Sequence, residues 1–252
     1  MHKDGAVAPA LRLMGVAAAC AGVALSVPHR YPVLSGAALL TLSVLTTSVC
    51  ASVAWHRHSF AAAPLEDAVH RWFPQGGAWA HYDIPNIMLL AQAPLAALLI
   101  SRHAQRAAIV RRVTRVYAAT MALRSVMLLS TNLPDSSPMC HTAEQQALSL
   151  PFTAHSVSAK AWDIFRGGGG VLTCGDMMFS GHTVVFTLLT LTWHQYLVPR
   201  GAAPILAWNA AGVAMIVITR LHYTVDVLVA LCITGSVWRE MSVPSGYFAP
   251  CQ

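Results

Sequence analysis

Two short polar segments in an otherwise apolar chain carry residues suited to phosphoryl transfer. His222 and Asp226 are four residues apart, so on a helix their side chains share one face and can meet. A carboxylate bonded to one ring nitrogen fixes the histidine tautomer and leaves the other nitrogen as a nucleophile or base. His182, at the start of another apolar run, supplies a second ring for proton transfer. We therefore predict a catalytic trio of His182, His222 and Asp226, in which His222 attacks phosphorus.

The elements that must position this trio are membrane helices. Of 252 residues, 56% are hydrophobic and only 10% are charged, whereas soluble domains have ~25% charged residues. The mean hydropathy is +0.54. A spanning helix needs ~20 mostly apolar residues, and six runs approach this length. They are Val33–Ala54, Ile84–Ser101, Val113–Ser130, Thr183–Val198, Ala202–Thr219 and Tyr223–Val237. The predicted fold class is all-α: a polytopic membrane helix bundle with six core transmembrane helices.

Three segments follow from this pattern. Residues 33–239 are predicted to form one catalytic membrane domain, and residues 240–252 a short cytosolic tail. Residues 1–32 form an N-terminal segment that contains a further apolar run, Leu11–Val27. The sequence leaves open whether this run is a seventh span, a signal-like segment or an interfacial helix.

The distribution of arginines predicts the orientation. Arg102, Arg106, Arg111 and Arg112 lie between the second and third predicted core spans, with no acid nearby. The positive-inside rule places this loop in the cytoplasm. Alternation of the spans then brings both histidine segments to the opposite face. The net charge of +6 does not indicate nucleic-acid binding, because no basic cluster is interleaved with aromatic residues.

Other residues are weaker candidates for the site. Asp176 could bind a cationic headgroup or steer a histidine, although such a residue more often caps a helix. Arg124 lies inside an apolar run and could bind phosphate or form a structural pair. Tyr223 is more often a packing residue than a substrate contact. Cys140 and Cys174 lie in the longest polar segment, and the sequence leaves open whether they form a disulfide.

The cysteines give no sign of a metal site. The six cysteines form no CxxC or CxxH pair, so we expect no zinc. The proposed chemistry uses only side chains and lipid substrates, so we expect no cofactor.

The histidine motifs resemble those of a known family. Residues 174–183, Cys-Gly-Asp-Met-Met-Phe-Ser-Gly-His-Thr, and residues 222–227, His-Tyr-Thr-Val-Asp-Val, resemble the two signature motifs of the sphingomyelin synthase family, which includes the inositol phosphorylceramide synthases. Pro64-Leu65-Glu66-Asp67 resembles its Pro-Leu-Pro-Asp motif, with Glu in place of the second Pro. A further upstream resemblance comprises Arg124, Thr131-Asn132-Leu133-Pro134 and Cys140. The resemblance extends from about Val33 to Val237.

The resemblance implies a fold, a reaction and a location. It implies six membrane helices with both ends cytosolic, and a lumenal or extracellular active site in the Golgi or plasma membrane. It implies transfer of a phospho-headgroup from a glycerophospholipid to ceramide, with release of diacylglycerol. It assigns the catalytic triad to His182, His222 and Asp226. The headgroup (phosphocholine, phosphoinositol or phosphoethanolamine) and any homo-oligomer stay open.

Two other functions compete with this one. Lipid phosphate phosphatases share Ser-Gly-His and a His-x-x-x-Asp pair and use water as the acceptor. Here, however, Phe179 precedes Ser180, Arg220 lies only two residues before His222, and a Lys-x6-Arg-Pro motif is absent. A transporter or membrane scaffold is the non-enzymatic alternative. Inverted repeats or helices broken within the membrane would favour a transporter, and the sequence shows neither.

Overall fold

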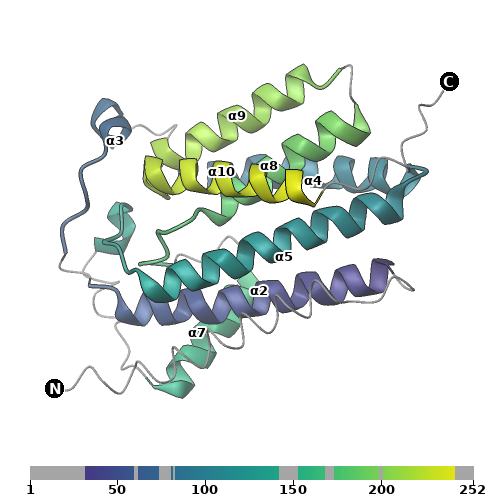
Figure 1. The fold of residues 1–252 in the computed structure, drawn as a ribbon. Helices are drawn as coiled ribbons and strands as arrows, with labels where there is room; N and C mark the ends of the chain where they lie inside the picture. The colour runs from purple at the N-terminus through teal and green to yellow at the C-terminus, as the bar shows by residue number, and fades with distance from the viewer. Residues whose placement is uncertain are drawn as a thin grey trace.

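Long helices that run side by side make up most of the described chain in this computed structural model (Figure 1). The structure describes residues 32–59, 62–73, 81, 83–141, 153–167, 173–198 and 201–241, and within these ranges it contains helices and no strand. The α-helices are α2 (Pro32–Arg57), α3 (Ala68–Trp72), α4 (Ile84–Arg102), α5 (Arg106–Ser130), α7 (Ala154–Gly167), α8 (Gly181–Thr192), α9 (Ala203–Ile218) and α10 (Thr224–Glu240). The run Leu11–Val27 and most of the C-terminal tail lie outside the described residues.

Six of these helices coincide with the six predicted apolar runs: α2, α4, α5, α8, α9 and α10. Within the described residues, Ser35–Arg57 and Ile84–Arg102 are long and apolar enough to cross a membrane, and Ala203–Ile218 is apolar but shorter. Helix α8 continues into a π-helical turn, Trp193–Leu197. The fold is therefore helical as predicted, and it contains apolar helices that suit a bilayer.

Helix α5 begins earlier than the apolar pattern indicated. It starts at Arg106 rather than Val113, because arginine favours helix and hydropathy does not register this preference. Arg112 lies inside the added residues 106–112 and is buried. Its guanidinium donates to Tyr196 Oη at 2.8 Å and to the Trp238 carbonyl at 2.8 Å. Arg112 therefore ties α5 to the ends of α8 and α10 instead of lying on a solvated face.

Helix α8 lies at the centre of the bundle. A buried cluster joins Val184 and Leu188 of α8 to Met121 of α5 and Ala230 of α10. On the α9 side, a Cβ atom added at Gly212 would overlap the ring of Phe186. The absence of a side chain at residue 212 therefore allows α8 and α9 to approach closely. This packing fixes α8, whose first turn carries His182.

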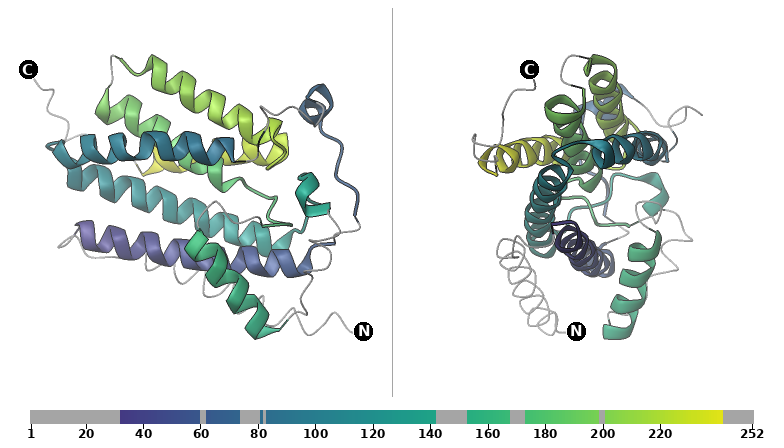
Figure 2. Two further views of the ribbon diagram at one scale, coloured as in Figure 1. Left: turned by 180° about the vertical axis from the view of Figure 1, so that it is seen from behind. Right: turned by 90° about the vertical axis from the view of Figure 1, so that its right-hand side faces the viewer.

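Helix α7 was not predicted, because it lies within the long polar segment between the third and fourth core spans. It packs obliquely against α2, as both views in Figure 2 show. Ser52 of α2 donates its hydroxyl to the Val157 carbonyl at 2.9 Å, and the Lys160 ammonium lies 4.9 Å from the centre of the Trp55 ring. Lys160, Asp163 and Arg166 interrupt its apolar residues, so no continuous apolar run marks the helix.

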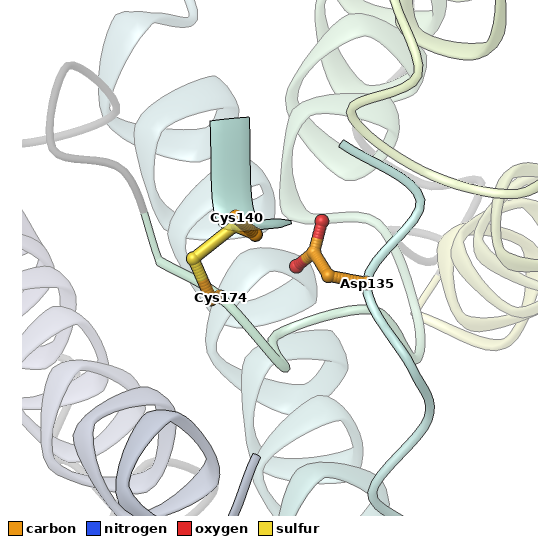
Figure 3. A group of neighbouring side chains, drawn as sticks. All are labelled: Asp135, Cys140 and Cys174. Carbon is orange, nitrogen blue, oxygen red and sulfur yellow. A yellow bond between two sulfur atoms is a disulfide. The ribbon is translucent and has the colours of Figure 1, made fainter. Parts of the chain in front are cut away.

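Several helix ends meet at one end of the bundle, on the left in Figure 1. There α5 ends and α8 and α10 begin, so the polar loops that precede α8 and α10 lie together. A disulfide joins Cys140 to Cys174, with Cα atoms 5.7 Å apart, and connects the segment that follows α5 to the loop that precedes α8. Asp135 lies beside the disulfide (Figure 3) and accepts hydrogen bonds from the amides of Ser137 at 2.8 Å and Gly175 at 2.9 Å.

We expect non-reducing mass spectrometry of the purified protein to show the Cys140 and Cys174 peptides linked. The crosslink closes a loop with a sequence separation of 34 residues. Loop-closure entropy then contributes about 4 kcal/mol to the free energy of unfolding. Cys174→Ser should therefore lower the midpoint of thermal unfolding in detergent, whereas Cys232→Ser, at an exposed free cysteine, should not. Free thiols at both positions in protein from an oxidising compartment would contradict the disulfide.

Candidate active site

The three predicted catalytic residues come from two adjacent loops and the helices that follow them. His182 lies in the first turn of α8, His222 lies two residues before α10, and Asp226 lies in the first turn of α10. The centres of the two imidazole rings are 6.4 Å apart, with an edge-to-face arrangement. The amide of Ser180 also donates to the Asp226 carbonyl at 3.4 Å, which connects the two loops. The structure thus brings the trio together.

The tautomer of His222 is set by a backbone carbonyl. Its Nδ1 lies 2.9 Å from the Met177 carbonyl oxygen. A carbonyl only accepts hydrogen bonds, so Nδ1 carries the proton and Nε2 carries the lone pair. Burial lowers the pKa of His222 well below its usual value, and the positive charge of Arg124 acts in the same direction. The ring is therefore neutral, as attack on phosphorus requires.

The position of Asp226 differs from the sequence-based expectation. We expected its carboxylate to be bonded to the ring of His222, but Oδ2 lies 3.9 Å from Nδ1. That oxygen instead accepts the amide of Tyr223 at 3.1 Å, while Oδ1 is buried and has no hydrogen-bond partner among the residues that the structure describes. The carboxylate thus fixes the start of α10 and places a negative charge near the ring, while the Met177 carbonyl orients His222.

Asn86 is a residue of the site that the sequence reasoning missed. Its Oδ1 lies 2.8 Å from Nε2 of His182, so with the amide oxygen as acceptor Nε2 carries the proton and Nδ1 is free to gain or lose one. Asn86 lies in the first turn of α4, which begins at the same end of the bundle. A polar side chain at the start of an apolar run was the available signal, although nothing in the sequence connected it to His182.

Arg124 organises the loop that precedes α8. Its Nη1 donates to the carbonyls of Met178 at 3.1 Å and Phe179 at 2.5 Å. Its Nη2 lies 2.6 Å from both carboxylate oxygens of Asp176. Both side chains are buried, with 6% of Arg124 and 10% of Asp176 exposed. Of the roles considered for Arg124, the structure therefore favours the structural pair over a phosphate contact.

Asp176 and Tyr223 also have structural partners. Besides the two bonds from Arg124, Asp176 accepts the hydroxyl of Thr173 at 3.3 Å, so its carboxylate is bound by neighbouring side chains of the protein. Tyr223 is 2% exposed. Its hydroxyl accepts the amide of Leu65 at 2.9 Å and donates to the Pro134 carbonyl at 3.1 Å. These contacts connect the loop before α10 to two others.

One family model and several curated proteins match this chain. A family model described as "PAP2 superfamily C-terminal" matches residues 173–242, which include all three members of the trio. The chain is 31% identical over 190 residues to phosphatidylcholine:ceramide cholinephosphotransferase 2 of Caenorhabditis elegans, a match that covers 69% of this chain and 54% of that protein.

Two further relatives have names that specify other headgroups. The chain is 35% identical over 121 residues to a phosphatidylethanolamine:ceramide ethanolaminephosphotransferase of Trypanosoma brucei brucei, covering 47% of this chain and 35% of that protein. It is 34% identical over 122 residues to a phosphatidylinositol:ceramide inositolphosphotransferase of Oryza sativa subsp. indica, covering 48% and 36%.

The matched regions span between about a third and about half of these curated relatives. The names of these relatives specify three different headgroups. The chain is therefore a homologue of the sphingomyelin synthase-related proteins and of the ceramide inositolphosphotransferases, with a PAP2 superfamily C-terminal region at residues 173–242.

Proposed function

We propose that this chain transfers a phospho-headgroup from a glycerophospholipid to the hydroxyl of ceramide and releases diacylglycerol. The observation that carries the proposal is the pair of imidazoles whose ring centres are 6.4 Å apart, one of them with its tautomer set by the Met177 carbonyl. The names of the relatives support ceramide as the acceptor and a glycerophospholipid as the donor.

In the first half-reaction, Nε2 of His222 attacks the phosphorus of the donor lipid. The bond from phosphorus to the diacylglycerol oxygen breaks as the bond from phosphorus to nitrogen forms. His182, protonated at Nδ1, gives its proton to the departing alkoxide, which leaves as diacylglycerol. The positive end of α8 favours the charge on the phosphate oxygens, and the Asp226 carboxylate favours the positive charge on His222.

In the second half-reaction, His182 accepts the proton of the ceramide hydroxyl. The ceramide oxygen attacks phosphorus and the bond from phosphorus to His222 breaks. The product is ceramide with the phospho-headgroup attached. His182 ends protonated and His222 ends neutral, so the two half-reactions return the site to its initial state.

The headgroup and the membrane arrangement are further parts of the proposal. Choline, ethanolamine and inositol phosphates would all pass through the same phosphohistidine, so the trio does not distinguish among them. We infer six transmembrane helices, with the histidine loops on the non-cytoplasmic face of a Golgi or plasma membrane. The gathering of both loops at one end of the bundle supports this arrangement.

A lipid phosphatase is the second candidate, and the match to a PAP2 superfamily model favours it. In that reaction water would replace ceramide in the second half-reaction. The donor would be a lipid phosphate monoester, so the phosphohistidine would carry no headgroup and its hydrolysis would release inorganic phosphate. The donor lipid and the acceptor therefore separate the two functions.

His222→Ala should abolish transfer, because no other group in the proposal attacks phosphorus. His182→Ala should lower kcat by ~10²–10⁴, the usual contribution of general acid–base catalysis. Asp226→Asn keeps an oxygen that can accept the Tyr223 amide but removes a charge 3.9 Å from the His222 ring. At an effective dielectric constant of ~20 that charge is worth about 4 kcal/mol, or ~10³ in rate. Steady-state rates in proteoliposomes measure all three effects.

His155 provides the matched histidine control. It lies on α7, is exposed, and is distant in sequence from the trio. His155→Ala should leave the rate within about twofold of the wild-type value. Near-normal transfer by folded His222→Ala or His182→Ala would show that the proposed site is wrong. Donor lipid labelled at phosphorus should leave label at residue 222, and that label should be lost when ceramide is added.

Product analysis should distinguish ceramide from water as the acceptor. Proteoliposomes containing donor lipids with all three headgroups and fluorescent ceramide should yield one main fluorescent phospholipid, whose headgroup mass spectrometry identifies. Omission of ceramide should suppress diacylglycerol release by at least tenfold. Equal release of diacylglycerol with and without ceramide, accompanied by free phospho-headgroup, would instead establish water as the acceptor. Release of inorganic phosphate from phosphatidic acid would establish the phosphatase reaction.

Cysteine labelling should place the two ends of the bundle on opposite sides of the membrane. Ala104, between α4 and α5, and Ser158, on α7, are both exposed. In a background with Cys20, Cys232 and Cys251 replaced by Ser, an impermeant maleimide applied to intact cells expressing the protein at the plasma membrane should label Ser158→Cys. It should label Ala104→Cys only after permeabilisation. The reverse pattern would refute the proposed orientation.

A further inference from the structure

The segment Pro64–Trp72 packs against the start of α10 through Asp67. The Asp67 carboxylate caps the short helix α3, because Oδ1 accepts the amide of Val69 at 2.9 Å. The same carboxylate also binds Thr224, the first residue of α10. Its Oδ2 accepts the Thr224 amide at 2.8 Å, and its Oδ1 accepts the Thr224 hydroxyl at 2.9 Å. One side chain therefore joins two elements that are far apart in the sequence.

This contact completes the N-terminal end of α10. The first amides of a helix have no partner within the helix. Here Asp226 accepts the amide of Tyr223, and Asp67 accepts the next amide, that of Thr224. Thr224 lies midway between His222 and Asp226 in the sequence. Any shift of the Thr224 backbone would therefore move both members of the pair.

Two other contacts hold the same segment against the catalytic loop. The amide of Leu65 donates to Tyr223 Oη at 2.9 Å, and Nη2 of Arg220 donates to the His70 carbonyl at 2.9 Å. The rings of His70 and Tyr223 are 5.6 Å apart. The segment therefore contacts the loop on both sides of His222. Asp67 contributes the negatively charged group of the segment to these contacts.

We propose that Asp67 is a positioning residue, which holds the first turn of α10 through Thr224 so that His222 and Asp226 keep their reactive geometry. The inference rests on the proposed function, because it gives that site a further component. It also gives a physical role to the Pro64–Asp67 motif, which the reaction itself does not use. Asp67 touches neither histidine in the structure, so it acts on the reaction through α10.

The charge of Asp67 suits this role. Burial alone would raise the pKa of Asp67, but the hydrogen bonds from Thr224 and the interactions with His70 together outweigh burial, and the pKa lies below its usual value. The carboxylate is therefore ionised near neutral pH. A negative charge at the N-terminal end of a helix is stabilised by the helix dipole. An amide at this position could accept hydrogen bonds but would lack the charge.

Variants of the full chain in proteoliposomes separate positioning from the capping of α3. Asp67→Ala should lower kcat by about 10–100-fold with little change in KM for ceramide, the effect of losing hydrogen bonds to a charged group. Thr224→Val removes the hydroxyl contact without touching the α3 cap and should lower kcat by about 3–10-fold. Thr224→Ser should restore most of the rate.

A double-variant cycle tests whether the two residues act through one contact. Asp67→Ala combined with Thr224→Val should be no slower than Asp67→Ala alone, because the hydroxyl then has no carboxylate to bind. Glu66→Gln is the matched control. Glu66 is adjacent to Asp67 but exposed, and it pairs with the exposed Arg71 at 3.1 Å. Its rate should equal that of the wild-type protein.

Hydrogen–deuterium exchange gives a readout that needs no activity. In Asp67→Ala, the peptide covering residues 219–229 should exchange faster, while peptides from α5 should be unchanged; Glu66→Gln should show neither effect. Unchanged exchange in this peptide, additive losses in the double variant, or a normal kcat for folded Thr224→Val would overturn the proposal. Absence of ceramide phosphotransfer in the wild-type protein would refute the proposed function instead, and exchange would then decide the contact alone.

Discussion

The guanidinium of Arg124 is the interaction on which the geometry of the site depends. It binds Asp176 on one side of Met177 and the carbonyls of Met178 and Phe179 on the other. The Met177 carbonyl, which sets the tautomer of His222, is therefore held by its neighbours on both sides. Removing one partner of such a buried ion pair typically costs 3–5 kcal/mol, because a charge is left without a partner. Here the ion pair therefore helps to keep the Met177 carbonyl pointing at the ring of His222.

Backbone strain near both histidines is consistent with this dependence. Phe179 and Arg220 are non-glycine residues in the left-handed region, with φ of 64° and 60°, and they lie three and two residues before His182 and His222. Such conformations cost of order 1–3 kcal/mol and persist only where the surroundings determine them. Phe179 is held through its carbonyl by Arg124, and the Arg220 carbonyl accepts the hydroxyl of Ser136 at 2.8 Å. Hydrogen bonds from residues outside each loop therefore hold both strained positions.

The sequence was sufficient to predict most of the helices and the proximity of His222 to Asp226, because both depend on local patterns. Apolar runs locate six helices, and the four-residue spacing brings His222, just before α10, close to Asp226 in its first turn. The partners of the histidines could not be predicted in the same way. Every residue has a backbone carbonyl, so the sequence does not distinguish that of Met177. Asn86 reaches His182 because of how α4 packs against α8. Helix α7 was missed because charged residues interrupt its apolar face.

The pairing of Arg124 with Asp176 also could not be predicted from the sequence. Each residue considered alone would be interpreted as a substrate contact, because burying a charge in an apolar segment is energetically costly and such charges usually have a function. Only the fold shows that each charge is compensated by the other. The charge of Arg124 still acts on the trio, because it lowers the pKa of His222. In the proposed reaction this charge and the positive end of α8 would act on the phosphate and not on the headgroup, so one mechanism would serve several headgroups. Under that proposal, selection among choline, ethanolamine and inositol depends on residues outside the trio.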